Sequence, residues 1–221
     1  MTPKTRLLFG PLAGAILAIG VAGLPLMIRG YSHVQQTVSE IGEVGSPARV
    51  PFAVLLCIVA ACVLVFASAV RDLSVLASRS RLPAYLIGAM APSAAGVGLF
   101  AFPHPLHNVF GLSELIAYQA PLAFALSWQR DPHAKTLVTL SWIGYFCTLA
   151  AIALNLSSID RQGVVWAYVQ PVYGLAQRAL FGAWFTWLAV MGLLLSRRHR
   201  HEILVQDLAP NRSGAESGAV V

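Results

Sequence analysis

Six long runs of apolar residues constrain this chain more than any other feature of its sequence. A helix needs about 20 apolar residues to cross the hydrocarbon core of a bilayer. Six runs reach that length: residues 7–28, 51–70, 83–102, 109–128, 137–157 and 172–195. Each run is continuously apolar, whereas the strands of a membrane barrel alternate between apolar and polar residues. The sequence therefore predicts an all-α integral membrane bundle of six transmembrane helices.

Charge and length set the domain organisation. Only 11% of the residues are charged, compared with about 25% in soluble domains. The first run is longer than the 7–15 apolar residues of a signal-peptide core, so we expect it to remain as a span. We predict one transmembrane domain over residues 1–200. Residues 201–221 are polar and small, which is typical of a disordered tail.

The basic residues predict the orientation of the bundle. All but four of the 15 Lys and Arg fall on the side of the membrane that carries both termini; the four exceptions are Arg29, Arg49, Arg161 and Arg178. Loops rich in Lys and Arg stay in the cytoplasm. We therefore expect a multi-pass protein of the plasma (inner) membrane with both termini cytoplasmic. Because these charges flank the spans, the net charge of +6 does not indicate a nucleic-acid partner.

Residues 32–41, in the first outer loop, carry a helical pattern. Two stripes share helical spacing: Val34, Val38 and Ile41 are apolar, and His33, Gln36 and Glu40 are polar. Ser32 and Gln35 have the Ser-x-x-Gln spacing of a capping box. We expect a short amphipathic helix at the membrane interface, with its polar stripe facing either water or the mouth of the bundle.

The sequence "FPHPLHNVFG" joins the third and fourth runs. We expect Asn108 to cap the fourth helix. His107, Glu114 and Tyr118 then share one helix face. A carboxylate facing lipid at the depth of Glu114 is costly, so this face should point into the bundle. Arg178, the basic residue in the outer half of the last run, is the expected ion-pair partner of Glu114.

These outer polar residues are the candidate site. Glu40, His107 and Glu114 are the candidate catalytic residues, because a carboxylate beside a histidine is a common acid/base arrangement. The candidate substrate-binding residues are His33, Ser39, His104, Asn108 and Arg178. A purely structural clamp is the alternative, since buried ion pairs can fix helix packing. The histidines and carboxylates also include ligand types found in zinc sites, but we expect no cofactor because no metal-binding motif is present.

Three segments resemble a known family. They are "YSHVQQTVSEIG" after the first run, "FPHPLHNVFG" between the third and fourth, and "GLAQRALFGAW" in the last. With these motifs the chain resembles a family of small prokaryotic six-helix membrane proteins known as a domain of unknown function. Members often have an acidic residue after the Phe-Pro pair, where this chain has His104 and Pro105. The resemblance implies a bacterial plasma-membrane protein and no particular activity.

The expected function is binding or modification of a lipid or isoprenoid in a polar pocket open to the outer face. Arg178 would then hold an anionic headgroup. The alternative is a non-enzymatic scaffold or accessory subunit whose polar cluster is structural. A transporter is the third reading, and the sequence shows neither inverted repeats nor a helix broken in mid-membrane. Membrane lipids are the expected partners; Gly10 and Gly14 also fit contact with a second copy or another membrane protein.

Overall fold

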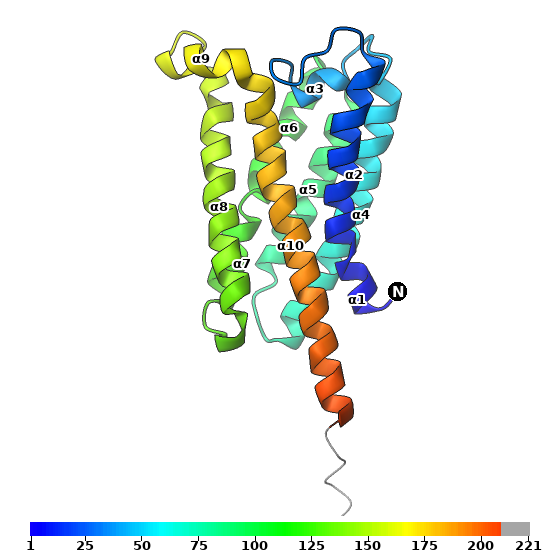
Figure 1. Cartoon of the computed structure of the whole chain (residues 1–221), viewed down its shortest axis with the longest axis vertical. Helices are drawn as coiled ribbons and strands as arrows, with labels where there is room; N and C mark the ends of the chain where they lie inside the picture. The colour runs from blue at the N-terminus through cyan, green and yellow to red at the C-terminus, as the bar shows by residue number, and fades with distance from the viewer. Residues whose placement is uncertain (209–221) are drawn as a thin grey trace, which may run out of the picture.

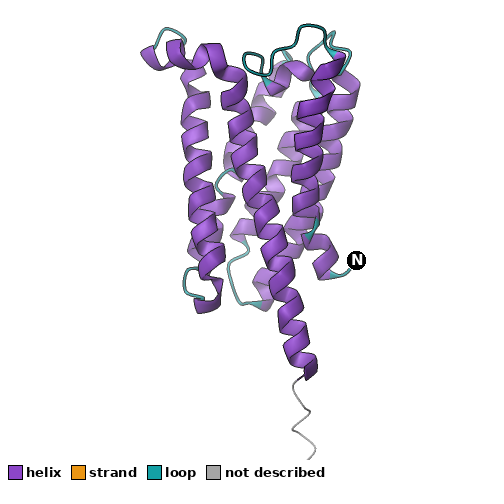
Figure 2. Cartoon of the chain, in the orientation of Figure 1, coloured by secondary structure: helices purple, strands orange, loops and turns teal. Residues whose placement is uncertain are grey.

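The computed structural model describes the backbone of residues 1–208 and the side chains of residues 1–198, and this part of the chain is helical without strands (Figure 2). Ten α-helices occur in it: α1 Pro3–Leu7, α2 Phe9–Gly23, α3 Val38–Ile41, α4 Arg49–Leu76, α5 Leu82–Leu99, α6 Pro105–Ala117, α7 Ala120–Trp128, α8 Lys135–Leu156, α9 Val164–Val169 and α10 Tyr173–Leu208. Short 3-10 turns cover Leu24–Met27, Pro132–Ala134, Ser157–Ile159 and Gln170–Val172.

The prediction of six membrane-spanning helices is confirmed. Six helical segments of the described chain are long and apolar enough to cross a bilayer: Pro3–Met27, Arg49–Leu76, Leu82–Leu99, Pro105–Trp128, Pro132–Ile159 and Val164–Arg198. The chain is therefore a multi-pass membrane protein. The last helix, α10, continues to Leu208 and so passes the boundary expected at residue 200; residues 209–221 of the expected tail lie outside the described residues.

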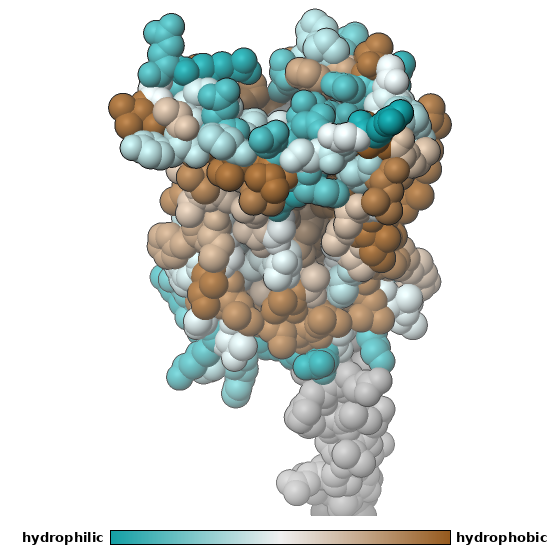
Figure 3. All heavy atoms as spheres, turned by 45° about the horizontal axis from the view of Figure 1, so that its top comes forward, coloured by the Kyte–Doolittle hydropathy of each residue, from teal (hydrophilic) through white to brown (hydrophobic). Residues whose placement is uncertain are grey.

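The two ends of the bundle differ. The chain begins at the end where α10 leaves the bundle, here called the terminal end, and α3 and α9 lie at the opposite end, here called the loop end (Figure 1). Hydrophilic side chains gather over the loop end, above a belt of hydrophobic ones (Figure 3). Ion pairs occur at the terminal end, where Arg6 lies 2.8 Å from Asp72 and Arg198 lies 3.1 Å from Asp131.

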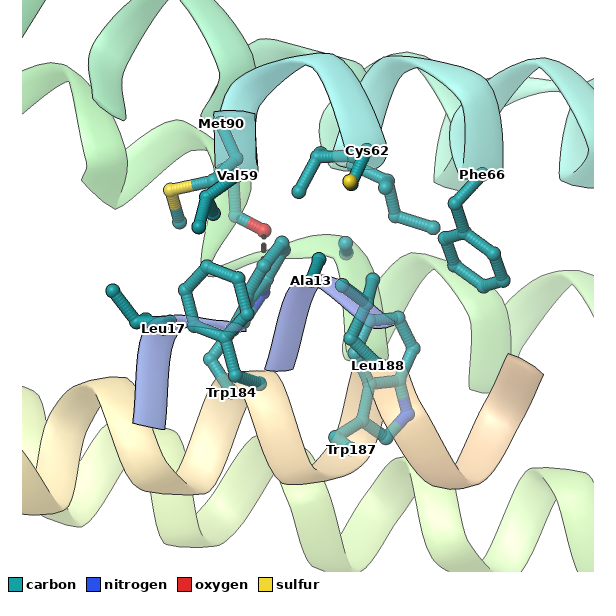
Figure 4. Packing of buried hydrophobic residues seen from close by; sticks show 14 of the residues in the cluster. Ala13, Leu17, Val59, Cys62, Phe66, Met90, Trp184, Trp187 and Leu188 are labelled. Atoms are coloured by element: carbon teal, nitrogen blue, oxygen red, sulfur yellow. Dashed lines mark hydrogen bonds between the residues drawn. The ribbon is translucent and has the colours of Figure 1, made fainter. Parts of the chain in front are cut away.

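The packing of the helices places α10 between the first and fifth spans. It packs against α2 on one side and α8 on the other. In the core where α2, α4 and α10 meet, Ala13 and Leu17 of α2 lie between α4, which carries Val59 and Phe66, and α10, which carries Trp184 (Figure 4). The side chain of Trp184 is fully buried, so this contact fixes α10 against the rest of the bundle.

The fourth span is broken in mid-membrane, contrary to the sequence-based expectation. Its two parts, α6 and α7, are separated at Tyr118 and Gln119. Pro121 has no N–H and so cannot donate to the carbonyl of Ala117. The indole N–H of Trp184 donates to that carbonyl instead, at 3.1 Å. The two parts also have different neighbours, since α6 packs against α5 whereas α7 packs against both α5 and α8.

Candidate functional site

The first loop folds around a capping box different from the expected one. Thr37 is the N-cap of α3, and its hydroxyl accepts from the backbone N–H of Glu40. One carboxylate oxygen of Glu40 accepts from both the N–H and the hydroxyl of Thr37. The prediction of one helix over residues 32–41 is therefore wrong. Ser32 only closes a turn with Gln35. The helix starts at Val38 because the side chains of Thr37 and Glu40 accept from each other's backbone N–H groups.

The hydroxyl of Tyr31 connects this loop to α10. It donates to the carbonyl of Thr37 at 2.6 Å and accepts from the guanidinium of Arg178 at 2.7 Å. Burial raises the pKa of this hydroxyl, although the adjacent Arg178 favours its ionised form. The hydroxyl therefore stays protonated at neutral pH and continues to donate to Thr37.

A glycine lets the loop approach α10 closely. A Cβ atom on Gly174 would overlap the carbonyl oxygen of Gln36 and would lie 2.8 Å from that of His33. The N–H of Leu175 donates to the carbonyl of Val34 at 3.2 Å. Gly174 is therefore required where the loop lies on the start of α10.

The start of α6 is capped by His104, so the prediction that Asn108 forms the cap is wrong. The Nδ1 atom of His104 accepts from the N–H of Leu106 at 3.2 Å. Asn108 lies inside the first turn, with an exposed side chain. Pro105 explains this shift, because proline is favoured in the first turn and the helix therefore begins earlier than Asn108.

His107 is held in one tautomer by the backbone. It is 5% exposed, and its Nδ1 lies 2.8 Å from the carbonyl oxygen of Phe100. Because a carbonyl can only accept, Nδ1 carries the proton. In the neutral ring, the lone pair is then on Nε2, which has no hydrogen-bond partner within residues 1–198. The imidazole can therefore accept a proton or a hydrogen bond through Nε2.

Glu40 and His107 both line a polar cavity at the loop end of the six spans, the level at which lipid headgroups lie in a bilayer, and we call it the headgroup cavity for this position. Its volume is about 780 Å³. Its walls come from the first loop, the start of α6, the α8–α10 connection and the start of α10. The lining residues are Gln35, Thr37, Ser39, Glu40, Phe102, His107, Asn108, Ser158, Arg161, Trp166, Gln170, Pro171, Tyr173 and Gln177.

Four predicted site residues are thus brought together: Glu40, Ser39, His107 and Asn108. The other four are not part of this cavity. His33 and Arg178 line a separate groove between α2 and α10, Glu114 lies at a small internal cavity, and His104 is exposed at the helix cap. The candidate site therefore divides into separate places.

A model of one family covers most of this chain. The family is described as "Protein of unknown function (DUF998)", and its model matches residues 11–194. The chain belongs to the DUF998 family. No curated protein and no solved structure matches it. The matched range of this DUF998 chain includes the first loop and most of every span.

Sequence reasoning missed the aromatic side of the headgroup cavity. Trp166 on α9 makes an edge-on contact with Tyr173, with ring centroids 5.1 Å apart, and the guanidinium carbon of Arg161 lies 5.9 Å from the Trp166 ring centroid. The available signal was an interfacial Trp and Tyr beside the isolated Arg161. Residues 157–172 have no helical periodicity longer than one or two turns, so the sequence did not predict that this connection brings Trp166 to Tyr173.

Glu114 of this DUF998 chain is buried, as expected, but the predicted ion pair with Arg178 is wrong. The carboxylate accepts from the hydroxyl of Tyr118, one turn further along, at 2.7 Å. Arg178 instead donates to Tyr31 and to the backbone oxygens of Gln36 and Gly174. The two residues therefore project into different spaces.

The candidate site has no arrangement of metal ligands within the described residues. No three side chains of His, Cys, Asp or Glu there lie close enough together to hold a metal ion. His107 lies in the headgroup cavity, whereas His33 lines the groove on the other side of the first loop. The geometry of this part of the chain therefore gives no support to a zinc site.

Proposed function

We propose that this DUF998 protein binds the polar headgroup of a membrane lipid or isoprenoid in the headgroup cavity. The observation that carries the proposal is a polar cavity to which α9, a helix with exposed apolar side chains, contributes Trp166. Amides, hydroxyls, one imidazole, one carboxylate and one guanidinium line the interior. Elsewhere on α9, Val164, Val165 and Tyr168 are 75%, 59% and 78% exposed. A polar cavity beside a helix with exposed apolar side chains suits a ligand that is partly embedded in the bilayer.

The positions of the charged groups favour a headgroup with both anionic and hydroxyl groups. Arg161 is exposed at the cavity and has no carboxylate partner among the described side chains, so it is available to an anion. Nε2 of His107 and the carboxylate of Glu40 can accept hydrogen bonds from hydroxyls. The Trp166 ring adds a flat apolar surface. Under the positive-inside orientation, the cavity opens at the outer leaflet.

His107 and Glu40 are also the groups that would carry acid/base chemistry on a bound headgroup. Nε2 of His107 is a base with a fixed orientation, because Nδ1 is held by Phe100. A histidine with this arrangement can remove a proton from a hydroxyl. Glu40 lines the same cavity, although one of its oxygens already accepts from Thr37.

The test measures the lipid that co-purifies with the protein. Wild type and the variants His107→Gln and Trp166→Ala are purified from the same host membranes, adjusted to equal folded protein, and extracted for mass spectrometry. Both variants should lose a specific polar lipid that wild type retains. His104→Gln is the matched control, because His104 is a histidine of the same connection that does not line the cavity. Equal lipid content in all four proteins contradicts the proposal.

The second candidate function is a scaffold or accessory subunit whose polar residues are structural. It is favoured by the hydrogen bonds of Glu40 to Thr37 and of Gln177 to the N–H of Val38, which hold the first loop in place. Under this reading, loss of complementation of the gene deletion tracks loss of folded protein. The measurement plots complementation against folded protein for Glu40→Gln, His107→Gln and Arg178→Gln. Variants that are folded but inactive exclude the scaffold.

A further inference from the structure

A second concave surface runs along the membrane-facing side of α2 and α10, the two helices that lie side by side in Figure 1. We call it the α2–α10 groove. It encloses about 540 Å³ and is mostly apolar. Small residues form much of its surface: Gly14, Ala18 and Ala22 on α2, and Gly182 and Ala189 on α10. Their small side chains leave a channel between the two helices.

The groove lies within the depth of the bilayer. On α10 it extends from Arg178 to Leu193, which is about 22 Å at the helical rise of 1.5 Å per residue. The hydrocarbon core is about 30 Å thick, so most of the groove contacts acyl chains rather than water. An occupant must therefore be apolar along most of its length.

The loop end of the groove is basic. His33 and Arg178 line it there. The guanidinium of Arg178 donates to three neutral oxygens, namely the hydroxyl of Tyr31 and the carbonyls of Gln36 and Gly174. These bonds orient the side chain and leave its charge uncompensated, since no carboxylate pairs with it among the side chains of residues 1–198. A positive charge at this depth favours a nearby anion.

We propose that the α2–α10 groove is a binding site for an anionic phospholipid of the surrounding leaflet. One acyl chain lies along the small residues of the groove, and the phosphate sits at its loop end beside His33 and Arg178. Arginine and phosphate form charge-assisted hydrogen bonds. This site is separate from the headgroup cavity: Gln177 lines the cavity, the next residue, Arg178, lines the groove, and the first loop lies between the two spaces.

The positive charge of Arg178 distinguishes between two possible occupants of the groove, a lipid and a helix of a partner protein. A stripe of Gly and Ala fits a second helix equally well. A helix would need an acidic side chain at the level of Arg178 to balance the guanidinium, and such residues are costly in a span. Anionic phospholipids carry their phosphate at that level already. The groove therefore fits a lipid better than a helix.

The test compares two lipids and four variants of the full chain in detergent. Native mass spectrometry follows the binding of phosphatidylglycerol and of phosphatidylcholine with the same chains. Wild type should prefer phosphatidylglycerol, and Arg178→Gln should reduce this preference on the order of tenfold, the loss of one charge-assisted bond. Ala18→Leu, which fills the groove, should weaken the binding of both lipids. Ala15→Leu is the matched control, because Ala15 is exposed on α2 outside the groove.

The outcomes distinguish a lipid site from a contact with a partner helix. If wild type binds both lipids equally, or if Ala15→Leu and Ala18→Leu behave alike, the proposal is wrong. A change of oligomeric state in Ala18→Leu with unchanged lipid binding assigns the groove to a partner helix and also overturns it. Because Ala18 faces the bilayer, this variant should fold even if Arg178→Gln does not. Phosphatidylglycerol binding that is lost in Trp166→Ala but retained in Ala18→Leu places this lipid in the headgroup cavity and overturns the groove proposal. Binding that is lost in Ala18→Leu but retained in Trp166→Ala places it in the groove, so the two proposals fail separately.

Discussion

The indole of Trp184 replaces the backbone donor that Pro121 removes from Ala117. In lipid, a backbone carbonyl must be satisfied within the protein because no water is available. Trp184 is fully buried and lies on α10, whereas Ala117 ends α6. This one hydrogen bond therefore connects the break in the fourth span to the last helix. The broken helix ends lie in the packed core, where the indole satisfies the freed carbonyl of Ala117. At a transport site the freed backbone groups would instead line a cavity, so this break gives no support to a transporter.

Replacing Trp184 by Phe should destabilise the protein by about 1–3 kcal/mol, because it leaves the Ala117 carbonyl unsatisfied. In a Pro121→Ala background the loss should be smaller, since the introduced alanine can supply the missing helical N–H. Thermal unfolding in detergent of the four proteins of this double-mutant cycle measures the coupling. Equal losses in both backgrounds mean that Trp184 acts through packing alone.

Gly174→Ala should displace the first loop from α10. The added Cβ would overlap the carbonyl oxygen of Gln36, a backbone atom that cannot move without shifting the loop. We expect lower thermal stability and faster proteolysis within residues 31–48. Gly182→Ala is the matched control on the same helix, because nothing lies within 4 Å of its added Cβ. It should be neutral or stabilising by up to about 1 kcal/mol. Similar behaviour of the two variants would contradict the close-approach argument.

Glu114→Gln and Arg178→Gln should have additive effects on stability. Glu114 bonds to Tyr118, and Arg178 bonds to Tyr31 and two carbonyls, so they share no partner. Glu114→Gln should be mild, because an amide oxygen can still accept from Tyr118. The readout is the melting temperature of both single variants and the double variant. A double variant that recovers stability would show that the two side chains are coupled after all.

The surroundings of Asp131, at the terminal end, predict that the stability of the protein depends on pH. Burial acts to raise the pKa of this carboxyl, but the N–H of His133 and the guanidinium of Arg198 outweigh it and hold the pKa below its usual range. The ionised carboxylate of Asp131 therefore stabilises the folded protein. This stabilisation is fully present above the pKa of the carboxyl in the unfolded chain, about 3.9, and is lost as the pH falls through its pKa in the folded protein. Wild type should melt higher than Asp131→Asn at pH 7, and the difference should shrink below about pH 4. Asp160→Asn, at an exposed carboxylate, is the control. A difference that is constant with pH would exclude the ionised carboxylate as its source.

The orientation of the bundle can be tested with single cysteines in a background without Cys57, Cys62 and Cys147. Cysteines at Ser46 and Gln162, at the loop end, should react with an impermeant maleimide on intact spheroplasts. Cysteines at Ser78 and His133, two exposed positions at the terminal end, should react only after lysis. This expectation follows from the excess of Lys and Arg at the terminal end. The opposite labelling pattern places the headgroup cavity on the cytoplasmic side.

The spans and the inward face of α6 were predictable because bilayer thickness and helical spacing act locally. His107, Glu114 and Tyr118 are all buried, as their shared helix face predicts. The partners of Glu114 and Arg178 were not predictable, because depth in the membrane follows from sequence position, whereas the rotation of one helix about its axis relative to another depends on packing. The break in the fourth span was missed although Pro121 is visible in the sequence, and nothing in the sequence identified Trp184 as the replacement donor.

The first-loop error has a similar origin. Ser32 and Thr37 both precede a residue that completes a capping pattern three positions later, and local spacing does not rank them. The choice of Thr37 follows from contacts with α10, where Gln177 accepts from the N–H of Val38. The aromatic wall of the headgroup cavity depends on α9 in the same way, since Trp166 reaches the site only because the α8–α10 connection folds back to Tyr173.

The position of α10 has a consequence for how the protein is made. Translation delivers the spans in chain order, and Ala117 is synthesised 67 residues before Trp184, which completes its hydrogen bonding. The last span also carries Gln177 and Arg178, whose side chains hydrogen-bond to the backbone of the first loop. A nascent chain with five spans inserted therefore has neither the α10 wall of the headgroup cavity nor the second side of the α2–α10 groove. The cavity and the groove are therefore complete only when the final helix enters the membrane.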